Sequence, residues 1–247
     1  TKGFGYFAHE GKQVGDVSHY GAATGVLTDS LLATNGNLDI RDYQRRFRSF
    51  FGPGGQWRGF IDNPTRITLE NFNAIERKAV EEAQSGMPDD LSDKQKRILV
   101  QKVMPYTRRL SGSALAQPVR EAISLTYKEK AIQDAGVHLA ETIDRNLVPA
   151  SGADDMQLPA VSKLPPLVAA HSGSTNLLDV VEAAVRVTNH NDEAVAWAKC
   201  AAVLLDGLFR GEPLANAMNS AIAEAPDQTS LKRAIESSEL NAISAGD

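Results

Sequence analysis

Apolar side chains that recur every three or four residues are the feature that most restricts how this chain can fold. The clearest series lies in the last third of the chain and comprises Val181, Ala184, Val185, Val195, Ala198, Ala202 and Leu205. This spacing places side chains on one face of an α-helix, whereas a half-buried strand alternates at every second residue. No run of the chain alternates in that way. The sequence therefore predicts an all-α fold, a compact bundle of many helices.

Start and stop signals divide this pattern into segments. Asn35-Gly36 is typical of a helix end, Asp39 and Ser92 are suited to cap helices, and Pro105 is expected to kink or stop one. Helices are expected over about 21–34, 39–51, 66–85, 92–104, 118–146, 176–188 and 192–209, with two shorter ones near the end. His138 is placed on the inward stripe of the segment 118–146, as a core or boundary histidine rather than a ligand.

Composition limits the class of protein. Hydrophobic residues make up 42% of the 247 and charged residues 23%, which is typical of a globular protein. No apolar run approaches the roughly 20 residues that a membrane-spanning helix needs. The net charge of -5 argues against nucleic acid as a partner, because Lys and Arg supply the affinity for phosphate backbones.

The single cysteine and the chain length bear on disulfides, on the compartment and on the number of domains. Cys200 is the single cysteine, which excludes an internal disulfide and favours a reducing, intracellular compartment. The length favours one helical domain over 1–247. Because the chain begins at Thr1 without methionine, we expect it to be trimmed, processed or part of a longer protein.

Common catalytic motifs are missing. The sequence contains no G-x-S-x-G nucleophile turn, no phosphate-cradling G-x-x-x-x-G-K-[ST] loop and no paired-histidine zinc helix. Acid–base or hard-metal chemistry with carboxylates stays open, and Asp154, Asp155 and Asp192 are its best candidates.

Four ordered stretches resemble the ADP-ribosylglycohydrolase family, particularly its J-type crystallin-like branch. The first is "SHYGAATGVLTDSLLATNGNLDIRDYQRRFRSFF", in which a His-Tyr-Gly loop enters a helix and an "LD..DY..RF" helix follows. The others are "GFIDNPTRITLENF", "DDMQLPAVSKLPPLVAAHSG" and "AVRVTNHNDEAVAWAKCAAVLLDGLFRGEP". They cover most of the chain in order, with a weak middle from about 86 to 150.

The resemblance implies an all-helical bundle of the ADP-ribosylglycohydrolase type. Its catalytic members hold two Mg²⁺ ions in a cleft and cleave the bond between ADP-ribose and an acceptor. Their ligands are an acidic pair at the start of a helix and a second acidic cluster near the carboxyl end. Aligning Thr24 with the family's run puts Ala22 and Ala23 where the acidic pair belongs, and a methyl group cannot ligate a cation. The second cluster is missing as well, and so are the helices that precede the His-Tyr-Gly loop in the family. The resemblance therefore implies a domain that is incomplete at both ends, and no cofactor is expected in this chain.

The resemblance also indicates other site residues in this chain, and each has two possible roles. His19 and Tyr20 either contact a ligand or pack the loop. Asp154 and Asp155 lie either near a ribose or in a solvated turn. The turn before residue 192 lies either near the cleft or only breaks the helix, with Asp192 as its N-cap. The candidate ligand-binding residues are His19, Tyr20, Thr24, Asp154, Asp155, His190, Asn191 and Asp192.

Three functions follow as hypotheses. In the first, the protein has kept the family's scaffold without its metal ligands, binds partners and has a site for an ADP-ribose-like molecule. In the second, it is an active hydrolase of an ADP-ribosyl or related N-glycosidic bond that uses Asp154, Asp155 or Asp192 together with a residue from outside this chain. In the third, which is compatible with the first, it is a subunit of a larger protein assembly.

Overall fold

The computed structural model describes residues 13–146, 151–157 and 159–244 of the chain. The chain divides into two compact units, and each is described by itself. Unit 1 combines residues Thr1–Thr68 with Gly152–Asp247, and unit 2 comprises Leu69–Ser151. The prediction of a single domain stays a prediction, because the compactness of each unit does not show whether the two fold together.

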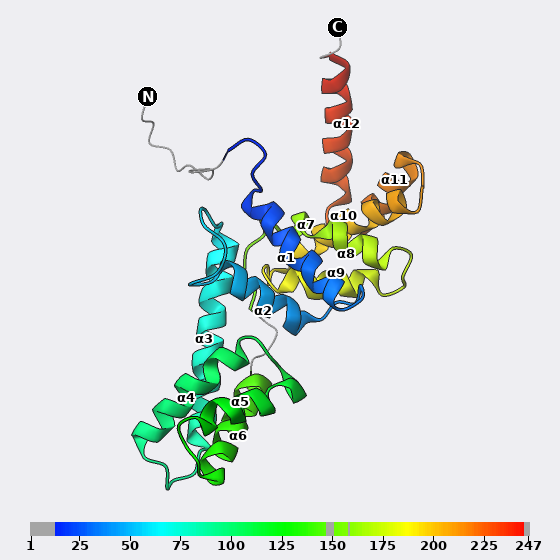
Figure 1. Cartoon of the computed structure of the whole chain (residues 1–247). Helices are drawn as coiled ribbons and strands as arrows, with labels where there is room; N and C mark the ends of the chain where they lie inside the picture. Colours follow the sequence, from blue (N-terminus) through cyan, green and yellow to red (C-terminus); the bar gives the residue numbers. More distant parts are fainter. Residues whose placement is uncertain (1–12, 147–150, 158, 245–247) are drawn as a thin grey trace, which may run out of the picture. The chain divides into compact units, whose positions relative to one another are not determined.

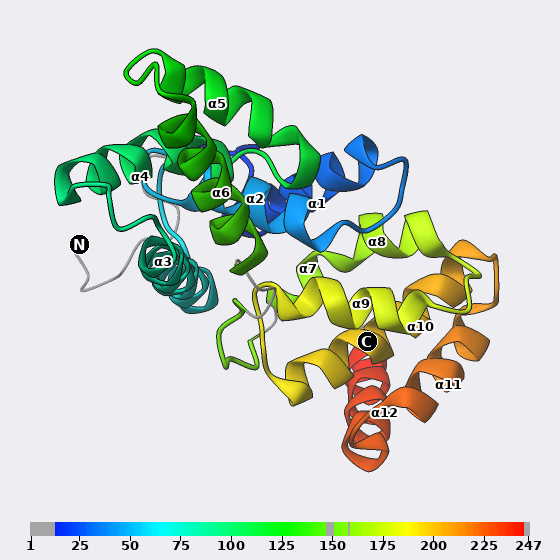
Figure 2. The ribbon, with the colours of Figure 1, turned by 90° about the horizontal axis from the view of Figure 1, so that it is seen from below.

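Unit 1 is helical (Figure 1). Its helices are α1 (His19–Ala33), α2 (Ile40–Phe51), the first turns of α3 (Asn63–Ser85), α7 (Pro159–Ser162), α8 (Leu164–His171), α9 (Leu177–Arg186), α10 (Asp192–Phe209), α11 (Leu214–Glu224) and α12 (Gln228–Ser244). Helix α1 packs on α2 and α8, and α10 packs on α8, α9 and α11. Figure 2 shows α8, α9 and α10 side by side. This packing joins the start of the chain to its last third in one core.

Unit 2 contains the rest of α3, together with α4 (Asp93–Thr107), a short 3-10 helix (Gly112–Ala114), α5 (Ala116–Ser124) and α6 (Lys130–Asn146). Helix α6 packs on α4 and α5. The side chains at the centre of its core are fully buried and comprise Leu99, Val103, Leu115, Val119, Ile123, Leu139 and Ile143. The all-α prediction is therefore confirmed in both units over the described residues, which contain one isolated β-bridge and no strand.

Side-chain caps explain where several helices begin. Ser18 accepts a hydrogen bond from the Gly21 amide at the start of α1, and Asp39 accepts one from the Asp42 amide at the start of α2. Ser92 forms a capping box with Gln95 at the start of α4. The predicted caps at Asp39 and Ser92 are confirmed, because these oxygens satisfy amide groups that have no partner within the helix.

Two local predictions are wrong, and a third is wrong in part. The segment 118–146 is two helices, because Thr126 and Tyr127 both donate backbone hydrogen bonds to the Ile123 carbonyl and close α5. His138 is exposed rather than on the inner stripe. Pro105 does not stop α4, which continues to Thr107, and the alternative of a kink stays a prediction.

The described helices include none that is long and apolar enough to cross a membrane.

Candidate functional site

The first site residue, His19, lies at the centre of an aromatic cluster in unit 1. Because Ser18 caps α1, His19 is the first helical residue, and only 5% of its surface is exposed. Its ring centroid lies 4.5 Å from that of Tyr20, 5.8 Å from those of Phe51 and Phe60, and 6.4 Å from that of Trp57. These rings leave little of the imidazole open to bulk water.

The polar partners of His19 lie where α3 begins. His19 Nε2 is 3.0 Å from Thr65 Oγ1 and 3.3 Å from Asp62 Oδ1, and the Thr65 amide donates to Asp62 Oδ1 at 2.9 Å. Burial raises the pKa of Asp62, but the hydrogen bonds from His19 and Thr65 outweigh it and hold the pKa below its ordinary value. Asp62 is therefore a buried, ionised carboxylate.

Lys163 adds a cation-forming group to this region. It lies between α7 and α8 with 2% of its surface exposed, and its Nζ donates to Thr188 Oγ1. Burial lowers the pKa of Lys163 to about 7, against the opposing effect of the Asp62 charge. The lysine therefore titrates near neutrality. We call His19, Asp62, Thr65, Lys163 and Thr188 the buried polar cluster.

A small cavity lies beside the cluster. Its walls are His19, Tyr20, Ala23, Phe47, Pro64, Thr65, Ser162, Lys163 and Thr188. The volume is about 10 Å³, which admits a single water molecule. Pockets for drug-sized ligands measure about 300–1,000 Å³, so a nucleotide-sized ligand does not fit this conformation. His19 Nδ1 and Asp62 Oδ2 are buried and make no hydrogen bond within the described part of the chain.

The two surface segments predicted to carry the site do meet. The Ala153 amide donates to the Thr188 carbonyl at 3.1 Å, and the His190 amide donates to the Ala153 carbonyl at 2.7 Å. Asn189 Nδ2 donates to the Asp155 carbonyl at 3.0 Å. The loop 151–157 is therefore docked on the turn 187–191, although the two are distant in the sequence.

The candidate carboxylates of these segments bind neighbouring groups rather than a common centre. Asp154 Oδ1 accepts from Asn191 Nδ2 at 2.7 Å, Asp155 Oδ1 accepts from the Gln157 amide at 2.8 Å, and Asp192 pairs with Arg186 at 2.8 Å. The described residues contain no group of three or more His, Cys, Asp or Glu side chains that could hold a metal ion.

The N-cap of α10 differs from the prediction. The Asn191 side chain accepts from the Ala194 amide at 3.0 Å, and Asp192 is already the first helical residue. The prediction of Asp192 as the cap is wrong by one position, because the extended backbone of Asn191 directs its amide oxygen at the free amide groups.

The predicted residues thus fall into two sets. His19 and Tyr20 line the cavity, and Thr24 Oγ1 donates to the Ser162 carbonyl at 2.8 Å beside it. The other set lies at the docked loop and turn and comprises Asp154, Asp155, His190, Asn191 and Asp192. Ala22 and Ala23 are buried with 9% and 7% of their surfaces exposed, and Ala23 lines the cavity. Methyl groups at these positions do not fit a Mg²⁺ site.

Sequence reasoning missed Asp62, Thr65 and Lys163. A usable signal existed for two of them, because "DNPT" at 62–65 combines a capping residue with a proline suited to a first helical turn. Lys163 is the only charged residue between Gln157 and His171. A lone charge in an apolar segment is either exposed or paired inside, and only the tertiary structure distinguishes the two.

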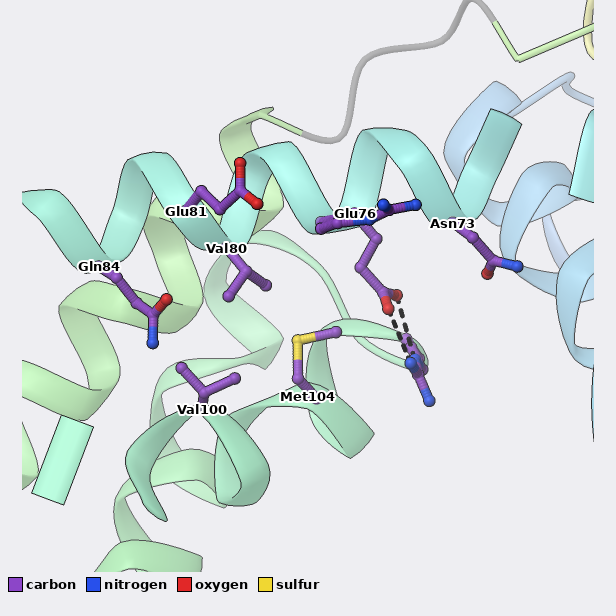
Figure 3. A pocket seen from close by; sticks show the side chains of 9 residues that line it. Asn73, Glu76, Val80, Glu81, Gln84, Val100 and Met104 are labelled. Atoms are coloured by element: carbon purple, nitrogen blue, oxygen red, sulfur yellow. Dashed lines mark hydrogen bonds and ion pairs between the residues drawn. The ribbon is translucent and has the colours of Figure 1, made fainter. Parts of the chain in front are cut away.

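Unit 2 has a separate groove between α3 and α4 (Figure 3). Val80, Val100 and Met104 form its apolar part, and its volume is about 500 Å³. At one end Arg108 donates to both carboxylate oxygens of Glu76, at 2.7 and 3.1 Å. The hydrogen bond to Glu76 raises the pKa of Arg108. The groove is open, and the charged groups at its end, Glu76 and Arg108, bond to each other. This pair therefore does not indicate a ligand.

The fold and the cluster define an all-α protein with a buried lysine–carboxylate–histidine centre. No protein-family model matches the chain, and no curated protein or solved structure matches it either. The likeness to ADP-ribosylglycohydrolases therefore depends on the sequence stretches quoted above.

Proposed function

We propose that this protein is an ADP-ribosylglycohydrolase-like protein without catalytic activity that acts as a binding or structural subunit of an assembly. The observation that carries the proposal is the burial of Ala22 and Ala23 in α1, at the positions where the resemblance implies metal-binding carboxylates. Because both methyl groups face the interior, they act as packing residues.

The neighbouring polar groups support the same proposal. Asp62 is bonded to His19 and Thr65, and Lys163 is bonded to Thr188, so each charge-forming group has a protein partner. The cavity beside them has room for one water molecule only. A centre arranged in this way is bonded within the chain and does not require a substrate.

The exposed apolar side chains at the junction of α10 and α11 support the binding role. Leu208, Phe209 and Leu214 have 41%, 53% and 58% of their surfaces exposed. Apolar side chains grouped on a surface mark contacts with other macromolecules more often than isolated ones do.

The catalytic half of the proposal is tested with ADP-ribosylated protein as substrate. The purified protein is incubated with Mg²⁺, and free ADP-ribose is measured by chromatography, with an active family member as the positive control. We expect no release above a chelator-treated sample. Mg²⁺-dependent release that the chelator abolishes would overturn the proposal.

The assembly half is tested by sedimentation velocity over a range of protein concentrations, since a second copy is the partner that a pure preparation supplies. We expect species heavier than one chain, and we expect Phe209→Ser with Leu214→Ser to disperse them. The matched control is Leu32→Ser, which changes a side chain that is 72% exposed on α1. A single monomeric species at every concentration would contradict self-assembly.

An active hydrolase is the second candidate, and one observation favours it: the structure brings the loop with Asp154 and Asp155 against the turn that leads into Asp192. If a preparation does release ADP-ribose, Asp155→Ala is the decisive variant. Unchanged turnover in that variant would remove Asp155 from any catalytic role.

A further inference from the structure

A chain of hydrogen bonds leads from the buried amine of Lys163 to the docked loop. Lys163 Nζ donates to Thr188 Oγ1, and Thr188 Oγ1 donates to Asn189 Oδ1 at 2.9 Å. Asn189 Nδ2 then donates to the Asp155 carbonyl at 3.0 Å. Each bond depends on the orientation of the one before it, so a change at the amine reaches the loop backbone.

The loop in turn covers the end of this chain of bonds at Asn189. Ala153 and Asn189 are both 0% exposed, and the backbone bonds of Ala153 to Thr188 and His190 hold the loop in place. Release of the loop would therefore let water reach Asn189 and Thr188, and through them the amine.

The charged surroundings of Lys163 are few. The titratable groups that line the cavity with it are His19 and Tyr20 of α1, and Asp62 at the start of α3 acts on it electrostatically. Burial, with a smaller effect from Asp62, raises the pKa of Tyr20, so the phenol carries no charge near neutrality. From α2 the cavity receives only Phe47. Within the described part of the chain, the carboxylate that acts on the ammonium form is Asp62, which His19 also contacts.

We infer that the protonation state of the Lys163 amine controls how firmly the loop 151–157 docks on the turn 187–191. A neutral amine is stable in the dry interior, whereas an ammonium is favoured by water. Protonation therefore favours the undocked loop and deprotonation favours the docked one. This control operates equally in a catalytic and in a non-catalytic protein.

The direction follows from linkage. The docked state holds Lys163 with a pKa of about 7, and a hydrated lysine has its ordinary pKa of 10.5. Between these two pKa values the undocked state binds more protons than the docked state. The population of the docked state therefore increases as the pH rises. One linked proton changes the opening equilibrium by up to roughly tenfold per pH unit.

Amide hydrogen exchange on the full chain tests this inference. The Ala153 and His190 amides report docking, because each donates across the contact between loop and turn. Protection factors, corrected for the intrinsic effect of pH on exchange, are measured between about pH 6 and pH 9. We expect a rise that begins near pH 7 and approaches roughly tenfold per pH unit. Corrected protection that does not change with pH would overturn the inference.

Variants separate Lys163 from the other titratable groups. Lys163→Met is expected to abolish the rise, whereas Lys199→Met, which removes a partly exposed lysine paired with Glu182 in the same unit, is expected to keep it. A rise that persists in Lys163→Met would assign the titration to another group and overturn the inference.

Thr188→Val provides a test should Lys163→Met fail to fold. It removes the hydroxyl that links Lys163 to Asn189 and keeps the backbone carbonyl that accepts from Ala153. We expect the pH-dependent rise at the loop amides to fall to less than twofold per pH unit. The amides inside α10 serve as a control in the wild-type protein, because they report global opening of unit 1. If the protection of the α10 amides equals that of the loop amides at every pH, the loop does not open by itself and the inference fails.

Discussion

The buried polar cluster of unit 1 and the Glu76–Arg108 pair of unit 2 both place a carboxylate beside a cation-forming group, but they differ in access to water. Asp62 and His19, whose Oδ1 and Nε2 atoms lie 3.3 Å apart, are 3% and 5% exposed, whereas the Arg108 side chain is 53% exposed. Water screens and solvates the second pair, and it reaches the first very little. The same type of contact should therefore have large energetic consequences in unit 1 and small ones in unit 2.

The largest expected effect comes from removing the carboxylate of the cluster. Asp62→Ala removes the buried carboxylate that contacts His19 and acts electrostatically on Lys163, and removing one partner of a buried ion pair costs about 3–5 kcal/mol. Denaturant unfolding followed by tryptophan fluorescence measures this loss, because Trp57 and Trp197, the two tryptophans of the chain, both belong to unit 1.

The control for this variant is Asp29→Ala on an exposed position of α1, for which we expect a change within about 0.5 kcal/mol. A loss below about 1 kcal/mol in Asp62→Ala would mean that the cluster is hydrated in solution, and the contrast with unit 2 would disappear.

The second effect is a dependence of unit 1 stability on pH. Lys163 has a folded-state pKa of about 7, below its unfolded value of 10.5. Between these values the unfolded chain binds more protons, so the free energy of unfolding rises with pH, by about 2 kcal/mol from pH 7 to pH 9. Tryptophan-detected unfolding at several pH values measures the rise.

Lys163→Met should remove that rise and should be more stable than the wild-type protein near pH 6, because it no longer buries an ammonium. A wild-type stability that is level between pH 7 and pH 9 would show that the amine is not dry. Unit 2 supplies the comparison, since the cation of its main ion pair, the half-exposed Arg108, has a raised pKa and stays charged throughout this range.

Local periodicity predicted the helices well, because it reports which face of a segment is buried. It failed where the pattern continued through a break, as at Thr126, where backbone bonds to the Ile123 carbonyl close α5. It also placed His138 inward, although neighbouring residues of the same helix fill the core instead. Apolar spacing alone does not distinguish the residues at the edge of a buried face.

The candidate site was predictable only in part. The motif at His19 and the turn before Asp192 were found, but Asp62 and Lys163 were not, since their importance arises from distant segments that meet in the fold. A sequence shows that a lysine lies among apolar residues. It does not show which carboxylate or hydroxyl will lie beside it.

The third effect tests the cap of α10. Asn191→Ala removes the acceptor for the Ala194 amide and the contact with Asp154, and loss of such a cap costs about 1 kcal/mol. Asp192→Ala should cost less than about 0.5 kcal/mol, because its side chain is 93% exposed and its pair with Arg186 is screened by water. Tryptophan-detected unfolding compares the two variants. If Asp192→Ala proved the more costly one, the cap would lie one residue further along.

The smallest effect is expected in the groove of unit 2. A double-mutant cycle with Glu76→Gln and Arg108→Met isolates the coupling between the two side chains, which we expect to be about 0.5 kcal/mol. Unit 2 contains no tryptophan, so the exchange of the Val103 amide in α4, a residue buried in its core, provides the measure. Because Arg108 is half in water, the coupling should weaken further as salt is added. A coupling above about 2 kcal/mol that salt leaves unchanged would mean that the groove is dry, and that the two units handle charge in the same way.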